Sequence, residues 1–161
     1  MTINSTSNLA LISSTDLVHD HPQIVYRDRW LTLRSNGELT VHKYFFPALN
    51  SRTLLTRDIE SVTTAKALGL GWWDYKVWGI LPTYIYWQAD AHRGKLQLQG
   101  KLAEIEPNAL VIQTSEGWFH HVGVTCENPE RFMEEMGKLG VKVITQGGAA
   151  TRFYARHSHS E

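Results

Sequence analysis

The single cysteine of the sequence is the side chain best suited to covalent chemistry. Cys126 comes just before a helix that we expect to begin near Asn128, and a helix N-terminus lowers the pKa of a nearby thiol. Glu127 places an acid beside it. A nucleophilic Cys126, or Ser115 in the same role, would also need a histidine base, and most free cysteines pack as small apolar residues instead. We therefore predict no catalytic residue and expect the chain not to be an enzyme.

Histidines are the residues that could bind a metal ion. Six of them form close pairs: His19 and His21, His120 and His121, His157 and His159. Adjacent histidines in a strand point to opposite faces and cannot hold one ion. The other two pairs lie in or beside segments that we expect to be tails, whereas functional metal sites need oriented supporting partners. No glycine-rich phosphate loop of the strand–turn–helix type occurs. We predict no metal site and no cofactor.

One short stretch of the chain concentrates residues suited to binding. It contains three of the six tryptophans, a tyrosine and a lysine: Trp72, Trp73, Tyr75, Lys76 and Trp78. Aromatic side chains bury a large area at little cost in rotamer freedom, so on an exposed loop they could anchor a protein partner or enter a membrane interface. Alternatively the loop folds back and the rings pack inside the protein, since large exposed apolar patches are rare on monomers. Self-association would agree with both interpretations.

The composition fits one domain in a reducing compartment. The chain has 161 residues, and its 16 Lys and Arg balance its 16 Asp and Glu, so we expect no nucleic-acid partner. One cysteine excludes an internal disulfide, and no apolar run reaches the roughly 18 residues that a bilayer span requires. The absence of a signal segment favours a cytoplasmic protein. We expect a flexible tail at 1–20, a folded domain at 21–144 and a second tail at 145–161.

Strand and turn signals dominate the folded part. Asn36 and Gly37 both tolerate positive φ and predict a hairpin between two alternating runs. The predicted strands are 30–34, 39–46, 52–56, 58–64, 83–88, 95–99, 109–114 and 118–124. Residues 65–82 contain three glycines and no sustained period, which indicates a long loop. The chain is therefore predicted to be mainly β.

A helix is predicted at 129–139. Asn128 can cap its first turn, Pro129 costs nothing at the first helical position, and Gly140 can end it. Apolar residues recur through it at helical spacing. A short extended segment at 141–144 follows.

In this order of elements the chain resembles the pleckstrin-homology (PH) superfold, especially bacterial PH-like families of small uncharacterised proteins. Residues 58–62 look like the strand entry after the hairpin of such domains, and residues 122–132 look like their final strand and capping helix. The resemblance implies a bent antiparallel barrel of about seven strands, closed at one end by the C-terminal helix. PH-like domains bind phosphoinositides, peptides or proteins, and some bacterial ones form homo-oligomers. Those that bind phosphoinositides carry a Lys and an Arg-x-Arg around the first hairpin, and here Arg27, Arg29 and Lys43 occur in a different order.

We therefore expect a non-enzymatic binding or assembly module that uses the 72–78 loop as its contact surface. A protein partner or a second copy of the chain is the expected ligand, and peripheral membrane lipid is an alternative. A partner could also add a strand in the gap between the last barrel strand and the helix. A different class of function is a carrier that holds an apolar small molecule inside the barrel.

Overall fold

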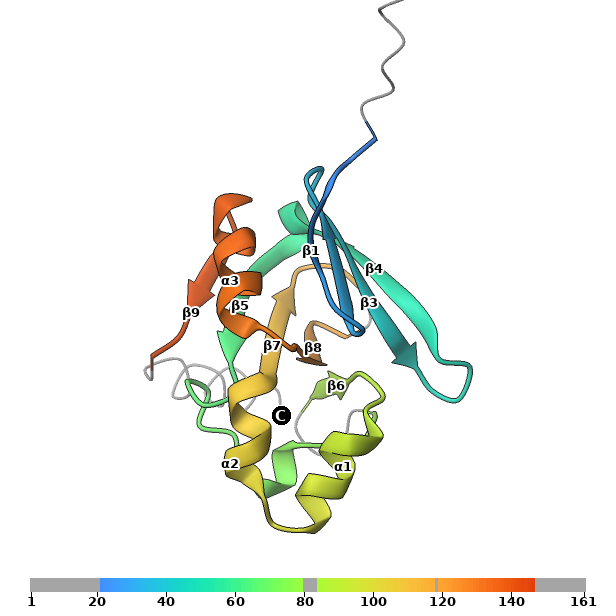
Figure 1. Cartoon of the computed structure of the whole chain (residues 1–161), viewed down its shortest axis with the longest axis vertical. Coiled ribbons are helices and arrows are strands. Elements are labelled where there is room, and N and C mark those ends of the chain that lie inside the picture. The colour runs from blue at the N-terminus through green and yellow to red at the C-terminus, as the bar shows by residue number, and fades with distance from the viewer. Residues whose placement is uncertain (1–20, 80–83, 118, 147–161) are drawn as a thin grey trace, which may run out of the picture.

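The computed structural model describes residues 21–79, 84–117 and 119–146. These residues form nine strands and three α-helices, so the chain is mainly β as predicted (Figure 1). The strands are β1 (Ile24–Arg27), β2 (Leu31–Arg34), β3 (Glu38–Phe45), β4 (Asn50–Leu55), β5 (Ile59–Thr64), β6 (Ile85–Trp87), β7 (Ala109–Thr114), β8 (His121–Thr125) and β9 (Lys142–Ile144). The helices are α1 (Ala91–Leu98), α2 (Leu102–Ile105) and α3 (Pro129–Lys138). The tail predicted at 1–20 and nearly all of the one predicted at 145–161 lie outside the described residues.

The first four strands form an antiparallel meander in the order β1-β2-β3-β4. β2 pairs with β3 so that Leu31 lies opposite Val41, and the turn between them holds Gly37 at φ +83°. Glycine adopts positive φ without a side-chain clash, which is why it suits this turn. The hairpin predicted from Asn36 and Gly37 is confirmed.

The second sheet has the order β6-β8-β7-β5-β9 and mixes strand directions. β5, β7 and β8 are antiparallel neighbours, whereas β6 runs parallel to β8 and β9 runs parallel to β5. Both edges of β8 are therefore paired, and the prediction that a partner adds a strand beside it is wrong. Among the described residues, backbone hydrogen bonds join the strands into two separate sheets and not into one closed barrel.

Two hydrophobic cores lie on opposite faces of the second sheet. The first fills the space between the two sheets and α3, and the second lies between the sheet and the segment that contains α1 and α2. β7 belongs to both, because alternate residues of a strand point to opposite faces. Leu110 and Ile112 pack into the first core, and Ala109 and Val111 pack into the second. In Figure 1 α1 and α2 lie together at the lower end of the molecule, while α3 lies beside β9.

The strand predicted at 95–99 is wrong, because these residues belong to or follow α1. The Asp90 carboxylate accepts hydrogen bonds from the backbone N–H groups of His92 and Arg93, at 2.9 and 3.2 Å, and so caps the helix. In the sequence Asp90 looks like a turn residue, and the alternation after it is too short to separate a strand from a helix. The prediction of a single helix is also wrong, because α1 and α2 lie between β6 and β7.

The terminal helix is confirmed. α3 spans Pro129–Lys138, and the Asn128 side chain accepts a hydrogen bond from the Arg131 N–H at 3.1 Å. The helix ends before Gly140, which has φ +84°. Its apolar face, which includes Phe132 and Met136, packs into the first core. None of the helices in the described ranges is both long and apolar enough to cross a bilayer.

Candidate functional site: an aromatic pocket with a basic rim

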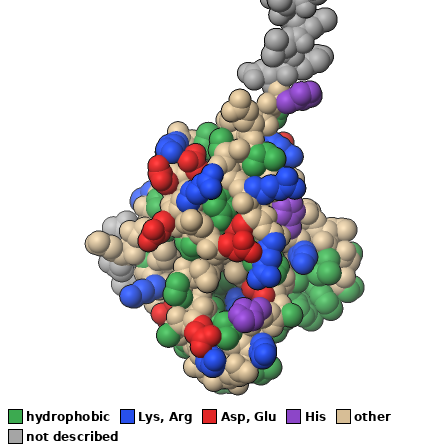
Figure 2. Space-filling model, viewed as in Figure 1, with side chains coloured by type: hydrophobic (Ala, Val, Ile, Leu, Met, Phe, Trp, Pro, Cys, Tyr) green, Lys and Arg blue, Asp and Glu red, His purple; other side chains and the backbone are tan. Residues whose placement is uncertain are grey.

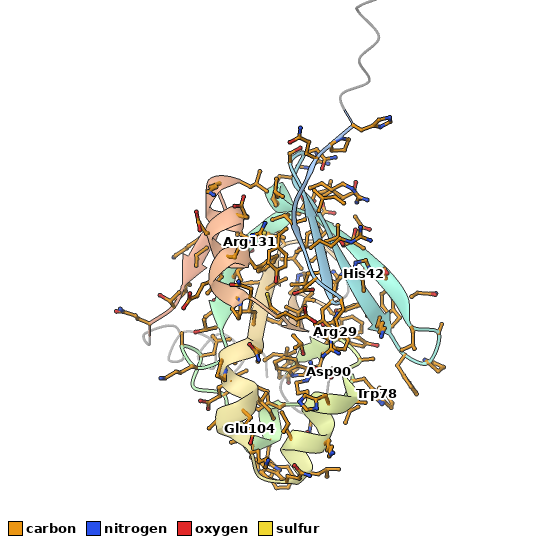
Figure 3. The ribbon with its side chains drawn as sticks, viewed as in Figure 1. Arg29, His42, Trp78, Asp90, Glu104 and Arg131 are labelled. Atoms are coloured by element: carbon orange, nitrogen blue, oxygen red, sulfur yellow. The ribbon has the colours of Figure 1, made fainter. Side chains whose placement is uncertain are left out.

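A hollow of about 410 Å³ lies where the end of the β3–β4 hairpin meets the start of α1. Four parts of the chain line it: the β1–β2 turn, the end of β3 with the turn after it, the segment 77–78, and residues 89–92. We call this hollow the rim pocket. Figure 3 shows Arg29, Trp78 and Asp90 gathered on this side of the molecule. In the space-filling view hydrophobic side chains gather at the right edge, over the end of the hairpin and next to basic side chains (Figure 2).

The apolar wall of the rim pocket is a stacked pair of rings. Phe46 and Trp78 lie with their ring centroids 4.3 Å apart and their planes 15° from parallel. Each is nearly half exposed, at 46% for Phe46 and 47% for Trp78, and Leu49 and Val77 extend the same surface. Such an exposed group of large apolar side chains is typical of a binding surface.

Two cations flank the third ring of the pocket. The Arg29 guanidinium carbon lies 4.5 Å from the centroid of the Trp30 ring, and the Lys43 Nζ lies 5.3 Å from it. Both distances fall in the range of cation–π attraction. Trp30 itself is buried, and its indole Nε1 has no hydrogen-bond partner among the described residues. The Trp30 ring therefore holds both positive groups beside the pocket.

An irregular stretch of β3 gives Lys43 its position. The pairing of β3 with β4 shifts register between Val41 and Phe45, and Lys43 has φ +53°. This left-handed conformation is unfavourable for a residue with a Cβ. Bulges of this kind redirect side chains. Here Lys43 is exposed at the pocket while the next residue, Tyr44, is fully buried.

A buried arginine holds the wall that carries Trp78. The Arg93 side chain donates to the backbone carbonyls of Lys76, at 2.8 Å, and Val77, at 3.3 Å. It also donates to the Gln88 carbonyl and, at 2.7 Å, to the Thr125 Oγ1. Burial lowers the pKa of Arg93 to about 10, against the opposing effect of Asp90, so the guanidinium stays charged at neutral pH. Its hydrogen bonds are committed to the fold and not to a ligand.

Asp90 is likewise occupied by the protein. Besides capping α1, its carboxylate accepts a hydrogen bond from Thr125 Oγ1 at 2.7 Å and lies 3.8 Å from Arg93 Nη1. Both side chains are almost fully buried. A buried carboxylate needs partners of this kind, because an unpaired buried charge is costly.

Gln88, which precedes the lining residue Ala89, bridges the two sheets. Its Nε2 donates to the carbonyls of Trp30, at 3.1 Å, and His42, at 2.6 Å. Its Oε1 accepts from the Thr125 N–H at 3.1 Å. One amide side chain therefore ties the first sheet to the second.

The structure separates the five residues predicted to form a contact surface. Trp78 lines the rim pocket, whereas Tyr75 is fully buried in the second core and cannot touch a partner. Trp73 is 73% exposed but does not line the pocket, and Trp72 forms an edge contact with it. Lys76 is half-buried, and its carbonyl binds Arg93. The 72–78 loop is thus partly packed and partly exposed.

Cys126, the residue considered for covalent chemistry, lies outside the rim pocket. Cys126 is fully buried, with its Sγ 3.1 Å from the Tyr26 hydroxyl, which donates to Asp28 at 2.7 Å. Burial is the main reason that the pKa of Cys126 is raised to about 12, so the lowering expected from the nearby helix start is wrong. Burial also lowers the pKa of His42, whose ring lies 2.9 Å from Thr32 Oγ1. The part of the chain that the structure describes contains no group of three or more His, Cys, Asp or Glu that could hold a metal ion.

Sequence reasoning missed most of the rim pocket. In the sequence Arg29 and Lys43 match only a reordered headgroup set, and Phe46 and His92 carry no signal of their own. These residues are far apart in the chain and come together only through folding. The aromatic residue between the end of a strand and Pro47 is the one local sign that could have pointed to Phe46.

Comparison with known proteins assigns no relative. No family model matches the chain, and neither a curated protein nor a solved structure is significantly similar to it.

Proposed function

We propose that this chain is a non-enzymatic binding module with a PH-like framework, and that the rim pocket is its contact surface. The order of elements supports the framework: a four-stranded meander, three further antiparallel strands, and a helix that packs on the core between the sheets. The chain departs from that pattern by the segment between β5 and β7, which holds β6, α1 and α2, and by β9.

The observation that carries the proposal is the exposed Phe46–Trp78 stack at the edge of a hollow of about 410 Å³. Aromatic anchors and pockets of this size are typical of recognition sites. Apart from the Trp30 indole N–H, the buried polar groups nearby are occupied: Asp90 and Arg93 bind each other and the half-buried Thr125. They therefore support the fold of the pocket and are poorly placed to act on a substrate.

A protein segment fits this surface better than a free small molecule or a membrane. Phe45, the residue before Phe46, is also exposed but does not line the hollow, so a small ligand in the hollow would leave exposed apolar surface uncovered. A hollow accepts a protruding side chain, whereas membrane binding relies on side chains that protrude from the protein. The space between the two sheets is filled by the first core, which argues against an apolar ligand carried inside it.

Selection of binding peptides from a random library displayed on phage would test this function. We expect selection on the wild-type protein to yield peptides whose affinity falls at least about tenfold for Trp78→Ala, because that change removes one ring of the stack. Trp73→Ala is the matched control, since Trp73 is exposed outside the pocket, and we expect it to bind as the wild type does.

Three results would overturn the proposal. One is a selection that yields no binding peptide, and another is an equal loss of affinity for Trp73→Ala and Trp78→Ala. The third comes from light scattering on a sizing column, with and without anionic liposomes. A dimer that Trp78→Ala abolishes would show that the ligand is a second copy of the chain. A liposome complex that Trp78→Ala abolishes would show that the ligand is a membrane.

A further inference from the structure

The charges around the rim pocket are unbalanced. Two cations, Arg29 and Lys43, line it, whereas the one acid among its described lining residues is Asp90. Asp90 is almost fully buried and is neutralised by Arg93 and by its hydrogen bonds. The part of the lining that a ligand can reach is therefore basic, although the whole chain has a formal net charge of zero.

The two cations are available to a ligand. Lys43 is exposed and makes no ion pair within the described residues; its Nζ lies 5.3 Å from the centroid of the Trp30 ring. Arg29 already holds a carboxylate, that of Glu127, at 3.1 Å. Both partners of this pair are more than half exposed, and such surface pairs are weak and readily exchanged. Glu127 thus occupies a position in which the carboxylate of a ligand could bind to Arg29.

The apolar and basic parts of the pocket are adjacent and come from different elements. The Phe46–Trp78 stack forms one wall, and the Trp30 ring with its two cations forms another. A ligand that fills the hollow must satisfy both, because a buried cation left without a partner costs binding energy. A partner with only apolar side chains would leave the positive rim uncompensated.

We propose that the rim pocket recognises an acidic–apolar peptide segment, in which a large apolar side chain packs against Phe46 and Trp78 and a neighbouring carboxylate pairs with Arg29 and Lys43. This inference rests on the proposed function, and it adds the chemistry of the partner and the two residues that select it. The unfavourable backbone of Lys43 agrees with the inference, because strained conformations cluster where a side chain must be aimed at a ligand.

The peptides selected on the wild-type protein would test this inference when they are resynthesised with each Asp and Glu changed to Asn or Gln. We expect the affinity of the amide versions to fall by about tenfold or more, as is usual when a charge-assisted hydrogen bond is lost. The double variant Arg29→Gln, Lys43→Gln should bind the acidic peptides with the same loss of affinity. It should bind the amide versions about as weakly as the wild type does, since changing the peptide and changing the protein remove the same interaction. Added salt should weaken wild-type binding and leave the variant nearly unaffected.

A matched variant controls for net charge. Arg27→Gln with Lys95→Gln removes two exposed positive charges outside the pocket and should bind the acidic peptides as the wild type does. Far-UV circular dichroism would show that all variants are folded. Peptides that need Trp78 but bind equally well as amides would overturn the acidic preference and leave the binding function standing, whereas the absence of any selected peptide would overturn both. An equal loss for the matched variant would assign the effect to net charge and also refute the inference.

Discussion

At the scale of single residues, Cys126 shows how burial outweighs a local signal. A thiol next to a helix start is expected to ionise easily, but the sulfur is enclosed by the first core and lies 3.1 Å from the Tyr26 hydroxyl. Desolvation disfavours the thiolate more than the nearby hydrogen bonds favour it, and the pKa is raised to about 12. The residue therefore behaves as part of the core.

We expect the native thiol of Cys126 to react slowly with Ellman's reagent. At pH 8 a pKa of about 12 leaves about 1 in 10,000 molecules as thiolate, against roughly a quarter in the unfolded chain with an ordinary thiol pKa. The folded state keeps a proton that the unfolded state loses, so this group makes the free energy of unfolding decline as the pH rises from about 9 to about 12. Comparing modification rates with and without denaturant measures the difference. Equal rates would show that Cys126 is accessible and reactive.

At the scale of elements, the close approach of α1 to the Val77 side chain shapes the rim pocket. A Cβ on Gly94 would lie 2.1 Å from the Val77 Cγ2, which no packed side chain tolerates. The helix can lie against this segment only because residue 94 is a glycine. The position of Val77 and Trp78 therefore depends on α1 in two ways, through the close packing at Gly94 and through the hydrogen bonds of Arg93.

Two glycine substitutions should have opposite effects on stability. Gly94→Ala is expected to lower the free energy of unfolding by about 1–3 kcal/mol, because it overpacks the contact with Val77. Gly137 lies on the exposed face of α3, and a Cβ added there would have nothing within 4 Å. Gly137→Ala should therefore raise the free energy of unfolding by about 0.5–1 kcal/mol through helix propensity. Urea denaturation of both variants measures the change. If Gly94→Ala were as stable as Gly137→Ala, the close packing of α1 would be refuted.

The elements that could be predicted from the sequence are those with strong local signals. α3 has its cap, its apolar period and its terminating glycine, and β7 is a compact run of buried residues. α1 was missed because its start depends on the Asp90 cap and its buried residues include Arg93, which no hydrophobic pattern reveals. In the candidate site the sequence predicted Trp78, but Arg29, Lys43 and Phe46 join it only through the register shift in β3 and the contact between sheet and helix.

At the scale of the whole molecule, β7 makes the two cores depend on each other. Its alternate side chains fill the space on both faces of the second sheet, so neither core is complete without this strand. Cores that share a central strand are expected to unfold together.

Ile112→Ala tests this coupling. The change removes a fully buried side chain from the first core and should lower the free energy of unfolding by about 2–5 kcal/mol. Hydrogen exchange read by mass spectrometry should then be faster in α1, which packs on the second core, as well as in α3. Leu98→Ala is the control, because Leu98 is exposed on α1 and its loss should change stability by less than about 0.5 kcal/mol. Faster exchange in α3 alone would show that the cores unfold independently.

The division of the rim pocket between two parts of the chain has an evolutionary consequence. The four-stranded meander and its turns supply Arg29, Lys43 and Phe46, and the segment between β5 and β7 supplies Trp78 and His92. Mutations in that segment can reshape the apolar wall while the meander keeps its sequence and its basic groups. Descendants of such a protein could therefore acquire new partners one substitution at a time, retaining the preference for acidic segments and changing only the side chain that the pocket accepts.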